Sequence, residues 1–223
     1  MYEYKSDPYS SHSKILKLSK SLREKNPEVL DIGCAQGYIA RELKEKGHSI
    51  TGIELDESSA SLAKDYCKKL IIGDIETLNP QLKKESFDLI IFGDILEHTK
   101  DPEAVLKKYL QFLRQGSYAI ISVPNIANIH IRLSLLFGRF NYSQKGILDK
   151  THLRFFTLKT FKRLIKKSNL KLLKLEPAPI PLPLVFPSTA KSNIFHFIHK
   201  INYLFTKLWK KMFAYQFIIL AKK

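Results

Sequence analysis

Short runs of almost uninterrupted apolar residues alternate with amphipathic segments over the first half of the chain. The apolar runs are too short for helices and predict strands at residues 29–32, 48–53, 70–72, 87–92 and 118–123. The amphipathic segments between them predict helices at residues 39–46, 57–66 and 101–113. Strands that are apolar on both faces and alternate with helices are typical of a parallel sheet covered on both sides.

The pattern changes in the C-terminal part of the chain. A helix is predicted at residues 126–137, a second helix capped by Thr157 follows a polar loop, and residues 171–176 predict a strand. Residues 177–187 contain five prolines, which excludes a helix interior or a central strand. The closing run QFIILAKK predicts a last strand that returns to the sheet.

Residues 193–213 predict a basic amphipathic helix. Apolar side chains recur at spacings of three and four and form one stripe: Ile194, Ile198, Ile201, Phe205, Leu208 and Met212. The opposite side holds Lys200, Lys207, Lys210 and Lys211. This pattern is typical of a helix that lies on an anionic membrane surface. The alternative is that the stripe packs on the sheet or on a lid as ordinary core.

The net charge of +16 is concentrated in the C-terminal third. Residues 1–149 contain 21 Lys/Arg and 20 Asp/Glu, whereas residues 150–223 contain 16 Lys/Arg and one acid, Glu176. This asymmetry favours an anionic partner, either a membrane surface, a nucleic acid or a phosphorylated substrate, over a merely solvated surface. A nucleic acid is the weaker alternative, because no RNA-binding motif occurs and the aromatic residues lie among Ile and Leu.

The cysteine content and the hydropathy restrict the class of protein further. Cys34 and Cys67 are the only cysteines and belong to no CxxC or Cys/His cluster, which disfavours a disulfide scaffold or a structural zinc site. We therefore expect a cytoplasmic protein. The N-terminus shows no secretory signal, and no run reaches the roughly 18 apolar residues of a membrane-spanning helix.

The stretch VLDIGCAQG places a glycine turn directly after the first strand. It lacks the Lys-Ser/Thr pair of a phosphate-binding P-loop and the third glycine of a dinucleotide site. Acids end three successive strands, with Asp31 before the turn, Glu54 after the second strand and Asp74 after the third. A ligand that combines an ammonium group, a ribose and an adenine matches all three acids.

These motifs resemble those of class I S-adenosylmethionine-dependent methyltransferases. VLDIGCAQG is similar to the first motif of that family, GIELDE to the second, GDIE to the third, and residues 87–125 to the fourth and fifth. The resemblance covers roughly residues 25–175. It implies a Rossmann-like α/β fold, with a seven-stranded, mostly parallel sheet, an antiparallel last strand and helices on both faces. The departure from the family pattern is Ala35, where a glycine is usual.

The resemblance also implies which residues bind the cofactor, S-adenosylmethionine. Asp31 would face the methionine amine, Glu54 would hold the ribose hydroxyls, and Asp74 would meet the adenine. The complete expected set is Asp31, Gly33, Cys34, Gly37, Glu54, Leu55, Asp74, Ile75 and Asp94.

Two histidines are the candidate catalytic residues. His152 lies in the loop after the fifth strand and is expected either to act as a general base on a substrate hydroxyl or to fasten the loop. His98 follows Glu97 in GDILEH, which resembles the acid-x-x-Glu-His run that holds a divalent cation in some quinone-pathway O-methyltransferases. We expect no metal and favour the alternative that Glu97 and His98 start the helix, orient the loop and bond to the backbone, because the two-histidine or carboxylate-rich set that a metal usually needs is otherwise absent.

The expected layout is one methyltransferase domain over residues 1–223, with a cofactor core at 25–124 and a substrate lid at 125–157 and 177–213. The expected reaction is O-methylation of a small-molecule, lipid-linked or cell-envelope acceptor. The alternatives are methylation of RNA or protein, and a catalytically inactive membrane-associated scaffold that still binds the cofactor. The oligomeric state is left open.

Overall fold

The computed structural model describes residues 7–20, 26–189 and 192–223. Seven strands form one sheet in the order β3-β2-β1-β4-β5-β7-β6. Their bounds are Glu28–Ile32 (β1), Ser49–Glu54 (β2), Lys69–Ile72 (β3), Phe87–Gly93 (β4), Leu113–Pro124 (β5), Lys171–Ala178 (β6) and Gln216–Lys222 (β7). The β1–β5 pairs are parallel, and β7 runs antiparallel to both β5 and β6. The predicted fold class is confirmed.

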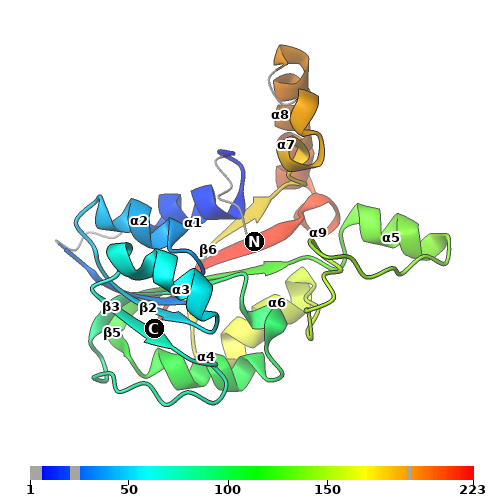
Figure 1. The fold of residues 1–223 in the computed structure, drawn as a ribbon. Helices are drawn as coiled ribbons and strands as arrows, with labels where there is room; N and C mark the ends of the chain where they lie inside the picture. The colour runs from blue at the N-terminus through cyan, green and yellow to red at the C-terminus, as the bar shows by residue number, and fades with distance from the viewer. Residues whose placement is uncertain (1–6, 21–25, 190–191) are drawn as a thin grey trace.

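Helices cover both faces of the sheet (Figure 1). On one face α1 (Ser11–Ser19) and α2 (Tyr38–Lys44) pack on alternate strand residues such as Val29 and Ile91. On the other face α4 (Pro102–Leu110) and α6 (Leu158–Lys167) pack on the intervening residues, such as Leu30 and Ile90. The near-continuous apolar strands therefore serve two cores at once.

The chain reverses its direction of travel across the sheet at β1. From β1 it moves outward through β2 and β3, then returns to β4 on the other side of β1. In open parallel sheets a ligand crevice forms at such a point, outside the carboxyl ends of the strands. The turns after β1, β2 and β4 are therefore where a site is expected.

The remaining helices complete the chain. The helix α3 (Glu57–Ala63) follows β2 and leads into a 3-10 turn, η1 (Lys64–Tyr66). A second 3-10 turn, η2 (Leu96–His98), follows β4. Outside the layers α5 (Ile129–Leu136) stands to one side, and α7 (Leu182–Val185) and α8 (Asn193–Leu208) rise above the sheet (Figure 1). The 3-10 turn η3 (Pro187–Thr189) and α9 (Lys210–Phe213) flank α8.

Several predicted elements are corrected in detail. The helix expected at 101–113 ends at Leu110, because β5 begins at Leu113 and continues through Gly116, whose φ is 79°. The helix expected at 193–213 breaks at Trp209, whose backbone angles (φ −130°, ψ 71°) are not helical. Pro177 does lie in a strand, but β6 is at the edge of the sheet, where a missing N–H is tolerated.

Candidate functional site

The glycine turn lies where β1 leads into α2. Gly33 and Gly37 have φ values of 72° and 75°, in the left-handed region that favours glycine. A Cβ atom at Gly37 would lie 2.9 Å from Cα of Ala63, so glycine is required there for α2 to approach α3. The N–H groups of Gly33 and Cys34 both donate to the carbonyl of Ile53, which fixes the turn against β2.

Glu54 joins the first two motifs directly. Its Oε2 accepts a hydrogen bond of 2.7 Å from the N–H of Ala35, and its Oε1 accepts from the N–H groups of Leu55 and Asp56. Ala35 has a φ of 47°, a conformation that costs about 1 kcal/mol for a residue with a Cβ. The hydrogen bond to Glu54 therefore stabilises this backbone conformation of Ala35, at a position where the motif it resembles usually has glycine.

Asp31 is buried beneath the turn. Burial, and then the nearby charge of Glu54, raise the pKa of its carboxyl to about 7. A cationic ligand group beside this buried carboxyl would stabilise its charged form. Cys34 is buried beside it, and its sulfur lies against Gly52.

The third motif adjoins the second. The N–H of Gly73 donates to the carbonyl of Glu54, which brings the ends of β2 and β3 together. Asp74 is exposed and its Oδ1 accepts from the N–H of Glu76, whereas Ile75 is buried in the core under Tyr109. Leu55 is exposed beside them. The structure thus brings the expected cofactor residues to one edge of the sheet.

The fourth strand connects this edge to a second region. The Ile95 side chain lies against Gly33, with its Cδ1 atom 2.7 Å from where a Cβ of residue 33 would stand. Asp94, just before it, has a φ of 54°, and its carboxylate accepts from Ser122 (2.5 Å) and Gln216 (2.7 Å). Asp94 therefore ties β4 to β5 and β7.

The two predicted histidines lie together beyond Asp94. Their ring centroids are 4.7 Å apart, and burial, followed by the neighbouring His152, lowers the pKa of His98. His152 Nδ1 lies 3.0 Å from the carbonyl of Ile147, which can only accept, so this nitrogen donates and Nε2 keeps its lone pair.

His98 is oriented in the same way through a short chain of hydrogen bonds. Its Nδ1 lies 3.1 Å from Thr151 Oγ1, and that hydroxyl donates to Asp149 at 2.7 Å. The hydroxyl therefore accepts from His98, which leaves Nε2 of His98 with its lone pair as well. In their neutral forms both imidazoles thus have their basic nitrogen at Nε2.

A cleft of about 470 Å³ opens beside His152. Its polar side is formed by Asp94, Glu97 and His152, and its apolar side by Pro181, Leu184 and Val185. Sequence reasoning missed further lining residues: Lys145, Gly146, Tyr215 and Gln216. Tyr215 and Gln216 lie at the start of the last strand, where the apolar pattern QFIILAKK indicated only a core role.

Tyr215 and Gly146 meet at the wall of this cleft. A Cβ atom at Gly146 would lie 2.8 Å from the Tyr215 hydroxyl, and Gly146 has a φ of 105°. Burial, and then the charge of Asp94, raise the pKa of Tyr215 to about 12. The hydroxyl is therefore a neutral donor at neutral pH.

A third possible ligand lies beside Glu97 and His98, although none is apparent in the sequence near them. It is His152, and possible ligand atoms of all three residues lie within 4.8 Å of one another. Two imidazoles and one carboxylate form a donor set that suits zinc and other divalent cations. Both Nδ1 atoms are hydrogen-bonded, as in histidine ligands generally. The residues therefore fit a cation.

Comparison with known proteins identifies the family. Residues 5–175 match the methyltransferase domain family, and the chain belongs to it. S-adenosylmethionine is the methyl donor that this membership implies.

Solved structures share the fold. A SAM-dependent methyltransferase from Archaeoglobus fulgidus has a TM-score of 0.62 at 21% identity, covering 96% of this chain and 95% of that one. One from Methanosarcina mazei has a TM-score of 0.64 at 18% identity, covering 93% and 96%. At these identities the likeness concerns the fold.

Curated relatives include ubiquinone biosynthesis O-methyltransferases. The Coxiella burnetii protein is 28% identical over 141 residues, which are 59% of each chain. The Idiomarina loihiensis protein is 33% identical over 105 residues, 44% of this chain and 42% of that protein. The match therefore spans no more than about three fifths of these relatives, and their substrate is a property of those proteins.

Proposed function

We propose that the protein transfers a methyl group from S-adenosylmethionine to a hydroxyl oxygen of a small molecule that also has an apolar part. The observation that carries this proposal is the cleft beside His152. It combines Asp94, Glu97 and His152 on one side with Leu184 and Val185 on the other. A polar, hydroxyl-bearing head and an apolar tail match these two sides.

The cofactor is assigned to the edge formed by the glycine turn and the ends of β2 and β3. Bound there, S-adenosylmethionine supplies an activated methyl group on sulfur. The Asp31 carboxylate suits its ammonium group, and the remaining acceptor capacity of Glu54 suits a ribose hydroxyl. The other proposed contacts are Gly33, Cys34, Gly37, Leu55, Asp74, Ile75 and Asp94.

His152 is proposed as the general base. Its side chain lines the cleft, and its Nδ1–H is held by the carbonyl of Ile147. As the carbon–oxygen bond forms and the carbon–sulfur bond breaks, the hydroxyl proton passes to Nε2 of His152. Alignment of the two reactants supplies much of the remaining rate acceleration. The contact of Ile95 with Gly33 connects the proposed cofactor site to the cleft.

A lipid-linked acceptor is favoured by the apolar side of the cleft. Leu184 and Val185 belong to α7, and both are exposed as well as lining the cleft. A chain attached to the acceptor can therefore leave the cleft along α7. The names of the curated relatives support a small acceptor of this type. The fold alone does not indicate the substrate.

A metal-assisted variant of the same reaction is favoured by one observation, the cluster of Glu97, His98 and His152. A divalent cation held by these three residues would lower the pKa of the acceptor hydroxyl. In that case His152 is a ligand rather than a base, and the two variants differ in their response to chelation.

The test uses S-adenosylmethionine with a tritiated methyl group and a fractionated cell lysate. The proposal is supported if the parent protein transfers label to molecules in the organic extract and a Glu54→Ala variant does not. Label in RNA or protein instead would overturn the acceptor class. Calorimetric binding of the cofactor without any transfer would indicate an inactive scaffold.

A further inference from the structure

The helix α8 packs on the protein with a side that combines Phe195 with several polar residues. Its buried residues are Phe195, His199 and Thr206, and Asn202 is half-buried between them. The apolar stripe lies on another side and is exposed: Leu208 is 83% exposed, Ile194 73% and Phe205 52%. The structure excludes the alternative in which the stripe packs as core.

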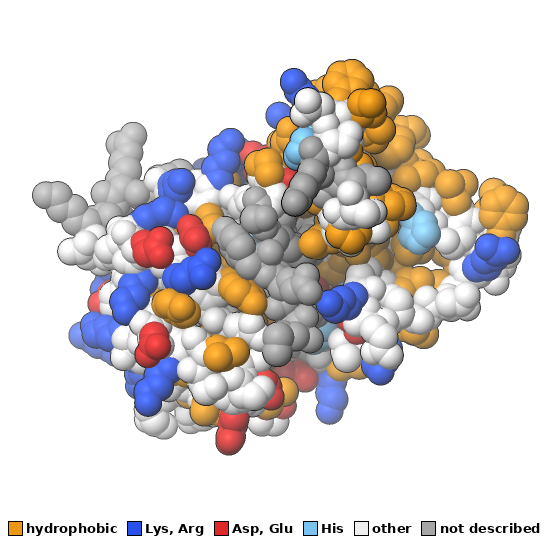
Figure 2. All heavy atoms as spheres, turned by 45° about the horizontal axis from the view of Figure 1, so that its top comes forward, with side chains coloured by type: hydrophobic (Ala, Val, Ile, Leu, Met, Phe, Trp, Pro, Cys, Tyr) orange, Lys and Arg blue, Asp and Glu red, His pale blue; other side chains and the backbone are white. Residues whose placement is uncertain are grey.

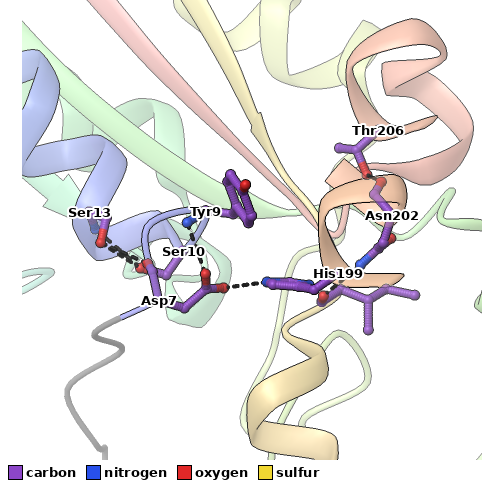
Figure 3. A network of polar contacts seen from close by, with 8 residues as sticks. Asp7, Tyr9, Ser10, Ser13, His199, Asn202 and Thr206 are labelled. Carbon is purple, nitrogen blue, oxygen red and sulfur yellow. Dashed lines mark hydrogen bonds and ion pairs between the residues drawn. The ribbon is translucent and has the colours of Figure 1, made fainter. Parts of the chain in front are cut away.

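Specific polar contacts hold this orientation (Figure 3). His199 Nε2 lies 2.9 Å from the carboxylate of Asp7, which comes from the segment before α1. Asn202 donates to the carbonyl of Ile180 at 2.9 Å, and the Tyr203 ring stacks on Tyr9 with centroids 4.3 Å apart. Because the side that makes these contacts packs on the protein, the apolar stripe faces outward.

The exposed stripe is part of a wider apolar surface. Hydrophobic side chains gather over the raised α7–α8 segment and on α5, on one side of the molecule (Figure 2). The exposed large side chains there are Leu184, Val185, Phe186, Ile194, Phe197, Ile198, Leu204, Phe205, Leu208 and Trp209 on the α7–α8 side, and Leu133, Leu135, Leu136 and Phe137 on the α5 side. Exposed apolar surface of this extent indicates an interaction site.

Positive charge accompanies this surface. Residues 177–223 contain seven lysines and no acidic residue. Lys200 and Lys207 are exposed on α8, and Lys211 is exposed on α9. Among the described residues no carboxylate lies within ion-pair distance of these three lysines. The partner must therefore offer both apolar contact and negative charge.

We propose that α8 docks on an anionic lipid bilayer, with its apolar stripe in the interface and its lysines at the headgroups. A helix of 16 residues is about 24 Å long and suits a position in the plane of the interface. Within the described segments no helix is long and apolar enough to cross a membrane. The surface continues through Leu184 and Val185 into the cleft, so docking places the cleft mouth near the lipid phase.

A second copy of the chain fits this surface less well. Pairing two α8 helices through their stripes would bring Lys200 and Lys207 of one copy near the same lysines of the other. Like charges at an interface are unfavourable, and no acid of residues 177–223 offsets them. Self-association is nevertheless an outcome that the test distinguishes.

Trp209 provides a direct probe. It is the only tryptophan of the chain and is 55% exposed at the end of α8. With vesicles containing phosphatidylglycerol we expect a blue shift of its fluorescence and quenching by brominated acyl chains. With phosphatidylcholine alone the shift should be much smaller, and raising salt from about 50 mM to about 300 mM should weaken binding.

Two sets of variants separate the apolar and the electrostatic contributions. Ile194→Ser with Leu208→Ser should lower the vesicle partition coefficient at least tenfold, whereas Leu62→Ser, at a residue 54% exposed on α3, should leave it unchanged. Each of Lys200→Gln and Lys207→Gln should lower it about fivefold, since a lysine near an anionic surface contributes about 1 kcal/mol. Lys83→Gln with Lys84→Gln is the matched control at exposed lysines.

Circular dichroism melting shows whether the stripe variant is still folded. If it is not, Phe197→Ser, at a residue 64% exposed, takes its place. Parent protein that stays free of anionic vesicles at low salt overturns the proposal. A dimer in sedimentation equilibrium also overturns the proposal, if the Ile194→Ser, Leu208→Ser double variant is monomeric and the other variants remain dimeric. Vesicle binding without methyl transfer leaves the docking intact and counts against the proposed reaction alone.

Discussion

His98 and His152, which lie on different loops, bring their imidazole rings to 4.7 Å at an angle of 77°. Each ring is oriented by a hydrogen bond at Nδ1, to Thr151 and to the carbonyl of Ile147 respectively. In its neutral form each imidazole therefore keeps its lone pair on Nε2, and the two rings lie side by side. This pair is where the proposed chemistry takes place.

The first prediction concerns the pH dependence of stability. Burial and the neighbouring His152 lower the pKa of His98, so the unfolded chain binds a proton at this residue more readily than the folded protein. Stability is then full above the unfolded pKa of about 6.5 and falls as the pH decreases below it. In urea unfolding, His98→Asn should reduce the loss between about pH 7.5 and pH 5.5. An unchanged loss, equal to that of the exposed control His130→Asn, would contradict this assignment.

The second prediction concerns cofactor affinity. Burial raises the pKa of Asp31 to about 7, and a cationic ligand group favours its charged form. S-adenosylmethionine should therefore bind more tightly as the pH rises from about 6 towards 7.5, with release of a proton. Calorimetry in buffers of different ionisation enthalpy measures that proton. Asp31→Asn should weaken binding and remove the pH dependence, whereas a flat profile in the parent would argue against contact with the amine.

Without ligand, the same carboxyl makes the opposite contribution to folding. Its pKa is raised in the folded state, so stability is full below the unfolded pKa of about 3.9 and declines as the pH rises through about 7. Cofactor binding should offset this decline. A thermal melt at about pH 8, with and without S-adenosylmethionine, should therefore show a larger stabilisation than one at about pH 6.

The third prediction compares two glycines with similar backbone conformations. Gly37 and Gly138 have φ values of 75° and 67°, but a Cβ atom would meet Ala63 at 2.9 Å in the first case and nothing within 4 Å in the second. Gly138→Ala should cost about 1 kcal/mol of unfolding free energy through backbone strain. Gly37→Ala should cost about 1–3 kcal/mol more, and it alone should weaken cofactor binding. Equal costs in urea unfolding would show that the packing of α2 on α3 is looser than described.

The fourth prediction separates the two variants of the reaction. If His152 is the base, methyl transfer by protein treated with a chelator should remain within about twofold of the untreated rate. A loss of activity that zinc or magnesium restores would instead favour a cation held by Glu97, His98 and His152. Glu97→Gln serves as the matched variant, because it removes the charge of one ligand and keeps the side-chain size.

The sequence was sufficient for the parts of the structure that depend on local patterns. Apolar runs predicted the strands, and glycines followed by an amphipathic segment predicted the turn at Gly33 and Gly37. The acids Asp31 and Glu54 could be placed at strand ends for the same reason. These features depend on neighbouring residues in the chain, so that the pattern alone indicates them.

Features that depend on distant contacts were beyond the sequence. The approach of His152 to Glu97 follows from a loop that returns over β4, where the N–H groups of Leu153 and Arg154 donate to the Glu97 carbonyl. The orientation of α8 follows from Asp7, which lies near the other end of the chain. The helix α1 was not predicted, because the alternation of lysines and aliphatic residues in SKILKLSK gives no clear period.

The most direct test of the proposed reaction is a single-turnover comparison of the parent protein with His152→Asn, using the acceptor fraction labelled by the parent. The asparagine amide can still donate to Ile147, so the loop should remain in place. The proposal predicts that the rate falls about a hundredfold or more while the affinity for S-adenosylmethionine is unchanged. A rate within about twofold of the parent, with the control His130→Asn behaving alike, would contradict the role of His152.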